Sequence, residues 1–215
     1  MAIRVVLLLS LLVYAQCKIL ELTCDHVREF VDGHNSRRLA LAKGEVPAQP
    51  AASTMNLMVW DDELAAKATK WASQNSFAHN SDKKIGSGRF TTGENIFMFS
   101  TTSHAVKLNV ESVLNGWFNE YEHYTYGRLL KDKKPDKVQT GHYTQMVWSN
   151  STYLGCGVSL FSKSGWMSYI VVCNYGPAGN IIGSVPYKSG KPSSSLKCAM
   201  KDCSSVYGDK CSFKN

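Results

Sequence analysis

The residues in this sequence best suited to chemistry are its seven cysteines. They are Cys17, Cys24, Cys156, Cys173, Cys198, Cys203 and Cys211. No two of them have the Cys-x-x-Cys spacing of redox-active thiols or common zinc sites, so disulfide bonds are the better interpretation. The motifs of serine hydrolases, zinc proteases, phosphate-binding loops and dinucleotide folds are also absent, and we predict no catalytic residue. An odd number of cysteines in a disulfide-bonded chain requires an explanation.

The first seventeen residues provide such an explanation. Arg4 precedes an apolar run over residues 5–13, and the small residues Ala15 and Cys17 follow it, as in a secretory signal peptide. Cleavage after Cys17 leaves 215 − 17 = 198 residues and 7 − 1 = 6 cysteines, whereas cleavage after Ala15 keeps an odd thiol, so the even count favours the first site. The run is shorter than the roughly 20 residues that span a bilayer, and no later segment is longer. We therefore expect a secreted, extracellular protein with no transmembrane segment.

The charge of the chain excludes some partners. Without Arg4 the chain has 23 basic and 17 acidic residues, a net charge of +6 that keeps it soluble or draws it to an anionic surface. No block of five or six like charges occurs, and the lysine-rich stretch 131–137 is broken by Asp132, Pro135 and Asp136, which indicates a solvated loop. No zinc-finger or basic-helix pattern is present, so nucleic-acid binding is disfavoured.

The spacing of apolar residues predicts helices in the first part of the chain. Apolar positions recur at steps of three and four over residues 24–42, and Gly44 follows as a stop signal. Asp61 is the expected N-cap of a second helix, and Val110 to Tyr121 predicts a third. The inner face of the second helix carries Leu64, Ala65, Ala68, Trp71 and Ala72. The polar, glycine-bearing residues 80–93 predict an exposed loop that ends at residues 94–97.

The second half of the sequence has a different pattern. Residues 143–148, 155–161 and 166–175 are short β-branched and aromatic runs that predict strands, with a hairpin turn at 163–165. Helices followed by hairpin strands, without βαβ alternation, predict an α+β fold around one core. After Tyr187 the composition shifts to Lys, Ser, Gly and Cys. We therefore expect a signal peptide over 1–17, one domain over 18–187, and a short disulfide-pinned C-terminal tail over 188–215.

Two longer segments carry a family resemblance. Residues 141–148, Gly-His-Tyr-Thr-Gln-Met-Val-Trp, and residues 171–181, Val-Val-Cys-Asn-Tyr-Gly-Pro-Ala-Gly-Asn-Ile, resemble the two signature motifs of the CAP superfamily. That superfamily groups the cysteine-rich secretory, antigen-five and pathogenesis-related-one proteins. Five shorter segments before these motifs also match the family, in the family's order. They are His34-Asn35 with Arg38, residues 60–65, residues 77–79, Gly93-Glu94-Asn95-Ile96, and residues 117–120. The chain is similar to the secreted venom-allergen or antigen-five-like members from about residue 27 to residue 187.

This resemblance implies both a fold and a site. The fold is a three-layer α-β-α sandwich, with helices on both faces of a mainly antiparallel sheet. The site is a central cleft at which His79, Glu94, Glu120 and His142 converge, matching the family's His-Glu-Glu-His tetrad. Two neutral imidazoles can bind Zn²⁺ or another divalent cation, while the carboxylates ligate it directly or orient the imidazoles.

The family's activity is mostly binding rather than catalysis. The resemblance implies binding of a sterol-like or fatty-acid-like lipid, of another small ligand, or of an extracellular protein target. A metal-dependent, protease-like extracellular hydrolase that uses the tetrad is the alternative. The loop over 126–140, which binds sterol in some relatives, is lysine-rich here, with only Leu129, Leu130 and Val138 as apolar anchors. Ser87, Ser100 and Ser103 are interpreted as loop serines rather than nucleophiles.

The resemblance also bears on the cysteines and on glycosylation. The family bridges its sheet at the positions of Cys156 and Cys173, so we expect that disulfide. Cys24, Cys198, Cys203 and Cys211 then allow three pairings, and the sequence does not choose among them. The three cysteines of the tail are too few for the family's channel-directed module, so the tail is interpreted as a clasp. Asn150 begins the Asn-Ser-Thr sequon, in an expected turn, and is the candidate glycosylation site.

Overall fold

The computed structural model describes residues 18–103, 107–131, 138–209 and 211. The predicted signal peptide, including Cys17, lies outside the described residues, as does the part of the lysine-rich loop from 132 to 137. In the residues that are described, no helix combines the length and the apolar composition needed to cross a membrane.

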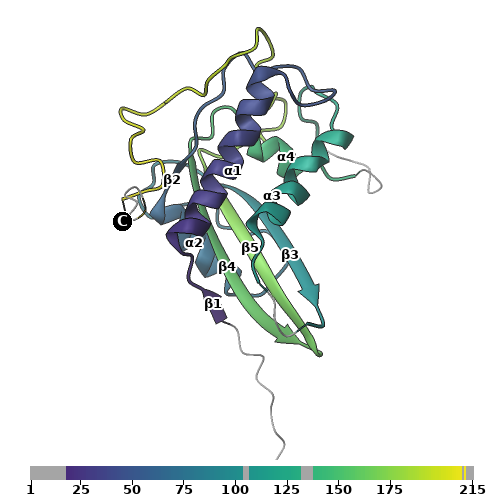
Figure 1. Ribbon diagram of the computed structural model, residues 1–215, viewed down its shortest axis with the longest axis vertical. Coiled ribbons are helices and arrows are strands. Elements are labelled where there is room, and N and C mark those ends of the chain that lie inside the picture. The colour runs from purple at the N-terminus through teal and green to yellow at the C-terminus, as the bar shows by residue number, and fades with distance from the viewer. Residues whose placement is uncertain (1–17, 104–106, 132–137, 210, 212–215) are drawn as a thin grey trace, which may run out of the picture.

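A five-stranded sheet forms the middle of the molecule (Figure 1). Its main path is β1(Lys18–Leu20), β4(Tyr153–Lys163), β5(Trp166–Gly176) and β3(Gly93–Thr101), all antiparallel, and the short β2(Val59–Trp60) pairs with β4 in parallel. The predicted hairpin between β4 and β5 turns at Ser164 and Gly165, which both have positive φ. Two positive φ values match the twist of an antiparallel pair. The long central strands therefore form the rigid centre of the sheet.

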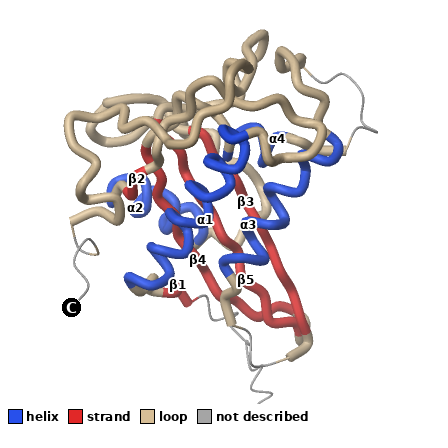
Figure 2. Tube along the Cα trace, turned by 45° about the horizontal axis from the view of Figure 1, so that its top comes forward, coloured by secondary structure: helices blue, strands red, loops and turns tan. Residues whose placement is uncertain are grey.

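Helices cover both faces of this sheet (Figure 2). One face carries α1(Cys24–Lys43), α3(Val110–Phe118) and α4(Gly141–Met146), and a 3-10 turn over Asn119–His123 follows α3; the other face carries α2(Asp62–Ala72). Side chains alternate along β5 as in any strand. Val171, Cys173 and Tyr175 belong to the core with α1 and α3, whereas Ile170 and Val172 pack with Ala68 and Ala72 of α2. The α+β sandwich expected from the sequence is confirmed.

The helix ends follow from local sequence. Thr23 caps α1 by accepting a hydrogen bond from the His26 amide, while the His26 ring accepts one from the Thr23 amide. Gly44, at φ +80°, ends the helix in the left-handed conformation that glycine adopts without strain. Asp61 is the N-cap of α2, as predicted. A Cβ on Gly155 or Gly157 of β4 would collide with the α2 backbone, so these glycines let the helix lie directly on the sheet.

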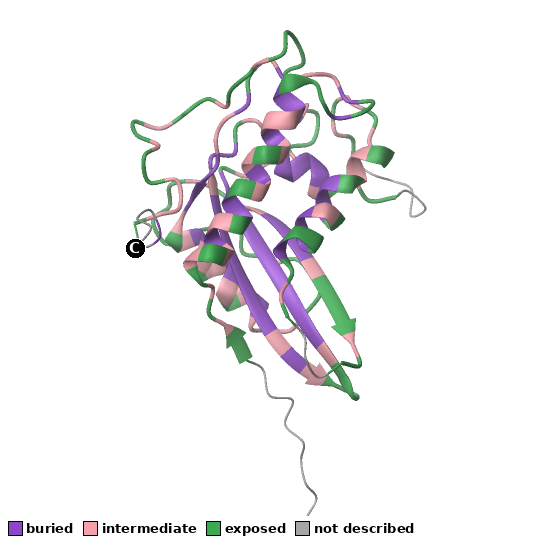
Figure 3. Cartoon of the chain, viewed as in Figure 1, coloured by how far each residue is buried: buried purple, intermediate pink, exposed green. Residues whose placement is uncertain are grey.

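Burial follows the layers (Figure 3). The strands β4 and β5 are buried along most of their length, while the far end of β3 and the hairpin tip are exposed. Trp117 and Tyr143 are among the largest fully buried side chains, and they lie between the sheet and the helices α3 and α4. This face holds the larger core and carries Glu120 and His142, whereas Glu94 has the parity of Ile96, which packs with α2 on the other face.

Three sequence-based predictions of local structure are wrong. Residues 143–148 were expected to form a strand, but residues 141–146 form α4, because side chains from distant elements hold both ends of this short helix. Residues 94–97 were expected at the end of a loop, yet they lie inside β3, where pairing with β5 buries Glu94 and Asn95. The third helix ends at Phe118, and Tyr121 lies in the 3-10 turn.

Three disulfides connect the cysteines in the described part of the chain. Cys156 is bonded to Cys173, which is its partner across the β4–β5 pair. The structure pairs the other four as Cys24–Cys211 and Cys198–Cys203. The tail runs back along residues 52–60, where the Leu57 amide donates to the Lys197 carbonyl and the Trp60 amide to the Val206 carbonyl. The division of the chain at residue 187 stays a prediction.

Candidate metal site

The first histidine–carboxylate pair joins a loop to the sheet. His79 follows α2 in the chain, and Glu94 is the second residue of β3. The His79 Nδ1 lies 2.8 Å from Glu94 Oε1, and the Asn80 amide donates to the same oxygen at 2.9 Å. The Glu94 side chain is 2% exposed, whereas that of His79 is 61% exposed. A buried, doubly bonded carboxylate therefore fixes an imidazole that faces solvent.

The second pair lies at the start of α4. Glu120 comes from the 3-10 turn after α3, and its Oε1 lies 2.6 Å from His142 Nδ1. The other oxygen, Oε2, accepts hydrogen bonds from the amides of His142 and Tyr143, at 2.9 and 3.0 Å. These amides belong to the first turn of α4, where a carboxylate is stabilised by otherwise unpaired N–H groups. The His142 ring stacks on Trp117. Glu120 thus orients His142 and caps the helix that carries it.

Both imidazoles have the same arrangement. Each is bonded through Nδ1 to a glutamate, and no described residue forms a hydrogen bond with Nε2 of either ring. A carboxylate at one ring nitrogen and a free second nitrogen is the usual state of a metal-binding histidine. The described residues contain no group of three or more His, Cys, Asp or Glu side chains arranged to hold a metal ion. The described residues thus show two histidine–carboxylate pairs, each of which leaves one imidazole nitrogen available as a donor.

A buried hydrogen-bond chain connects the two pairs to α1. Asn95, the neighbour of Glu94, donates from Nδ2 to the His142 carbonyl at 3.1 Å and to the Tyr175 hydroxyl at 3.0 Å. Tyr175 in turn contacts His34 Nε2 at 2.9 Å, and His34 Nδ1 contacts the Phe30 carbonyl at 2.7 Å. Burial lowers the pKa of His34 to about 3, so the ring is neutral. Its Nδ1 must then carry the proton that Phe30 accepts, and Tyr175 donates to Nε2.

Arg38 holds the other end of α4. Its guanidinium is fully buried and donates to the carbonyls of Met146 and Trp148 at 2.9 and 2.8 Å, and to that of Asn56 at 2.9 and 2.7 Å. Burial lowers its pKa to about 9, because desolvation penalises the charged form. A cation beside the last carbonyls of a helix is favourable. Arg38 therefore holds α4, and with it His142, against α1.

The three loop serines and the glycosylation candidate named from the sequence lie in the following environments. The Ser87 hydroxyl donates to Glu63, and the Ser100 hydroxyl lies 2.7 Å from that of Ser168, so neither is bonded to His79. Ser103 is bonded through its amide to Thr101. Asn150 is exposed in a turn, whereas Ser151 of the same sequon is buried and donates to the Pro177 carbonyl.

The sequence did not reveal that Asn95 and Tyr175 form hydrogen bonds near the predicted tetrad. Both lie inside the motifs that carry the resemblance, but their spacing of eighty residues says nothing about contact. In the pairing of β3 with β5, Asn95 lies opposite Cys173, and Tyr175 is two residues further along β5. Only the tertiary structure reveals that Asn95 contacts both the Tyr175 hydroxyl and the His142 carbonyl.

Comparisons with known proteins identify the family of the chain. The family described as "CAP: Cysteine-rich secretory protein family" matches residues 31–175. Venom allergen 5 of Rhynchium brunneum is 38% identical over 171 residues, which is 77% of this chain and 74% of that protein. Venom allergen 5 of Vespa velutina is 39% identical over 158 residues, covering 71% of this chain and 75% of that protein.

Solved structures show the same fold. The crystal structure of NaASP2 with Zn²⁺ is 32% identical, with a TM-score of 0.61, and the match covers 78% of this chain and 87% of that chain. The structure of BmVAL-1 is 26% identical, with a TM-score of 0.65, and covers 83% and 92% of the two chains. The chain belongs to the cysteine-rich secretory protein family, and within it resembles the venom allergen 5 proteins.

Proposed function

We propose that this chain is a secreted, non-enzymatic binding protein whose His79 and His142 hold a divalent cation such as Zn²⁺. The observation that carries the proposal is the shared arrangement of the two imidazoles, each bonded through Nδ1 to a glutamate. Such pairing fixes the ring and raises the basicity of the other nitrogen. The similar NaASP2 structure contains Zn²⁺, which supports the same choice of ion here.

Secretion is supported by the predicted signal peptide and by the three disulfides. Disulfides form and persist in oxidising compartments and are rare in the cytosol. All six cysteines in the described residues are bonded. A chain of this kind acts on molecules that it meets outside the cell.

The state of the two glutamates argues against hydrolysis. A metal-dependent hydrolase needs a third protein ligand or a free carboxylate that can take a proton from the metal-bound water. Glu94 is already bonded to His79 and to the Asn80 amide. Glu120 is bonded to His142 and to two helix amides. Either carboxylate would have to give up these bonds to act as a base, so binding is the better proposal.

Titration of the purified, metal-free protein with Zn²⁺ in a calorimeter tests this proposal. We expect one ion per chain, with binding lost in His79→Ala and His142→Ala and retained in the control His26→Ala, whose ring caps α1. Retained Zn²⁺ binding in both variants would contradict the site. Peptide hydrolysis that requires Zn²⁺ and both histidines would instead support the hydrolase.

A second candidate function is contact with an apolar partner at the loop over 126–131. The Leu129 amide donates to the Ser184 carbonyl, and the Gly183 amide donates to the Leu129 carbonyl, so this loop lies against residues 181–184. Leu130 is 75% exposed, and Ile181 and Ile182 are 54% and 59% exposed. Ile181 and Ile182 thus enlarge the exposed apolar surface that the sequence predicted for the loop alone. A lipid or an extracellular protein surface would bury them.

Co-sedimentation with sterol-containing phosphatidylcholine vesicles tests this second candidate. We expect Ile182→Ser to reduce binding, while Met98→Ser, at an exposed position of β3, leaves it unchanged. Equal binding of both variants would contradict a role for this surface.

A further inference from the structure

A pocket of about 540 Å³ opens at the edge of the sheet, away from the paired histidines. Along the outer edge of β4, β2 pairs with Tyr153 and Leu154, and β1 pairs with residues 158–160. Among the described strands, none pairs with residues 155–157 on that edge. Cys156 lines the pocket at this interruption. The cavity therefore results from the topology of the sheet, because two short strands flank a stretch that neither covers.

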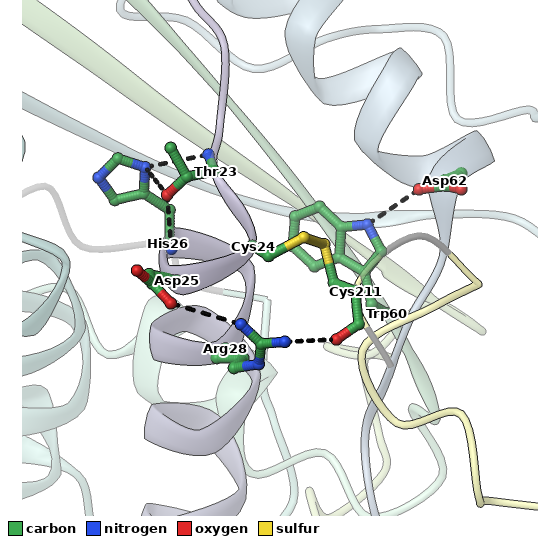
Figure 4. The surroundings of a disulfide bond; sticks show 8 residues. All are labelled: Thr23, Cys24, Asp25, His26, Arg28, Trp60, Asp62 and Cys211. Carbon is green, nitrogen blue, oxygen red and sulfur yellow. Dashed lines mark hydrogen bonds and ion pairs between the residues drawn. A yellow bond between two sulfur atoms is a disulfide. The ribbon is translucent and has the colours of Figure 1, made fainter. Parts of the chain in front are cut away.

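The walls of the pocket come from several parts of the chain besides Cys156 of β4. The start of the chain supplies Ile19, Leu20 and Leu22, the first turn of α1 supplies Val27, and α2 supplies Ala65 and Thr69. The tail supplies Tyr207 and Cys211. Figure 4 shows the Cys24–Cys211 disulfide beside the indole of Trp60, which is also a lining residue. A volume of this size, largely apolar and fixed by a disulfide, suits a small ligand.

The charges of the pocket are of one sign. Its charged lining residues are Glu21 and Asp62, in a chain that has 24 basic and 17 acidic residues. Asp62 accepts a hydrogen bond from Trp60 Nε1 at 3.1 Å, visible in Figure 4. Glu21 is exposed and has no hydrogen-bond or ion-pair partner among the described residues. A cation entering the pocket would therefore meet a carboxylate that is still free.

Arg28 of α1 contacts two of the lining residues, Cys211 and Tyr207. Arg28 donates to the Cys211 carbonyl at 2.8 Å and to Asp25 at 3.3 Å, and it lies over the Tyr207 ring. It thus holds the tail from outside and does not line the pocket. The indole of Trp60 adds an aromatic face, which attracts a desolvated cation more strongly than the rings of Tyr or Phe do.

From this geometry we infer a binding site for an amphipathic amine, a molecule with one ammonium group and an apolar body. The ammonium group pairs with Glu21 and Asp62 at the rim. The apolar body lies among Leu20, Leu22 and Trp60. The site is separate from the paired histidines, so it does not depend on the proposed metal.

Calorimetry with octylamine and octanoate, which share an apolar tail and carry opposite charges, tests the inference on the disulfide-intact protein in the presence of a chelator. We expect octylamine to bind at least about tenfold more tightly than octanoate, since the rim carboxylates attract one and repel the other. Glu21→Gln should weaken octylamine on the order of fivefold, as for a partly exposed ion pair, and Glu21→Lys should weaken it further. Glu29→Gln, on the exposed face of α1, is the matched control and should leave the affinity unchanged.

The position of the ligand is tested separately. In a two-dimensional NMR spectrum, the Trp60 indole N–H signal should shift on addition of octylamine, because this group donates to Asp62 and both residues line the pocket. Three results would each overturn the inference: octanoate binding as tightly as octylamine, unchanged affinity in Glu21→Lys, or shifts confined to other tryptophans. Because the chelator removes divalent cations, the octylamine result does not depend on whether His79 and His142 bind Zn²⁺.

Discussion

The pH dependence of stability follows from His34, which is buried in its neutral form beneath the candidate metal site. The pKa of His34 is about 3 in the folded protein and 6.5 in the unfolded chain, because burial disfavours the charged ring. The unfolded chain therefore binds the extra proton between these two values, and stability falls as the pH is lowered. The stabilisation is complete above pH 6.5 and is lost progressively toward pH 3.

The magnitude follows from the same two pKa values. Each pH unit below 6.5 costs about 1.4 kcal/mol, so lowering the pH to 4.5 should cost about 3 kcal/mol through His34 alone. Urea unfolding of the disulfide-intact protein at pH 7.5 and pH 4.5 measures this change, and His34→Gln is the reference. The variant should be less stable at pH 7.5, since Gln cannot replace both the bond to Phe30 and the bond from Tyr175.

The comparison isolates His34, because every other titrating group is common to both proteins. The loss of stability between the two pH values should be about 3 kcal/mol smaller in His34→Gln than in the natural protein. Equal losses in the two proteins would refute the assignment of a neutral, buried imidazole. A greater loss of stability in His34→Gln than in the natural protein would mean that the pKa of His34 is shifted in the opposite direction.

Three further predictions concern the ends of the chain and of α4. The secreted protein should begin at Lys18 and contain no free thiol; N-terminal sequencing and thiol titration check this, and a titratable thiol would contradict the even cysteine count. Arg38→Met should lower the free energy of unfolding by about 3–5 kcal/mol, since several buried carbonyls lose their donor, and Arg38→Lys should lower it less. Urea midpoints measure both, and a near-neutral Met variant would show that the carbonyls find other donors. Replacing Cys24 and Cys211 by Ser should cost about 5 kcal/mol, because this disulfide closes a separation of 187 residues. A melting temperature equal to that of the natural protein would mean that the tail is held by its other contacts.

Much of the fold could be predicted from local pattern. The helices α1 and α2 were evident from their apolar spacing, and Asp61 from its capping chemistry. The β4–β5 hairpin followed from two β-rich runs around a turn. These elements are decided by residues close together in the chain, so the sequence carries their signal directly. The α-β-α order of layers came from the resemblance to the family.

The helix α4 could not be predicted, because distant side chains stabilise it. Its sequence is rich in residues that favour strands, and it has only six residues, too few to be stable alone. Glu120 bonds the amides of its first turn, and Arg38 bonds carbonyls at its end. Tertiary contacts at both ends therefore override the local preference.

The sequence by itself determined the family, the positions of the tetrad residues within its motifs, and the even number of cysteines expected after cleavage. Only the tertiary structure decided how those residues meet. It pairs His79 with Glu94 and His142 with Glu120, connects the pairs through Asn95, and joins Cys24 to Cys211. The reason is that hydrogen bonds and disulfides act over a few ångströms in space, whereas these partners are separated along the chain by as many as 187 residues.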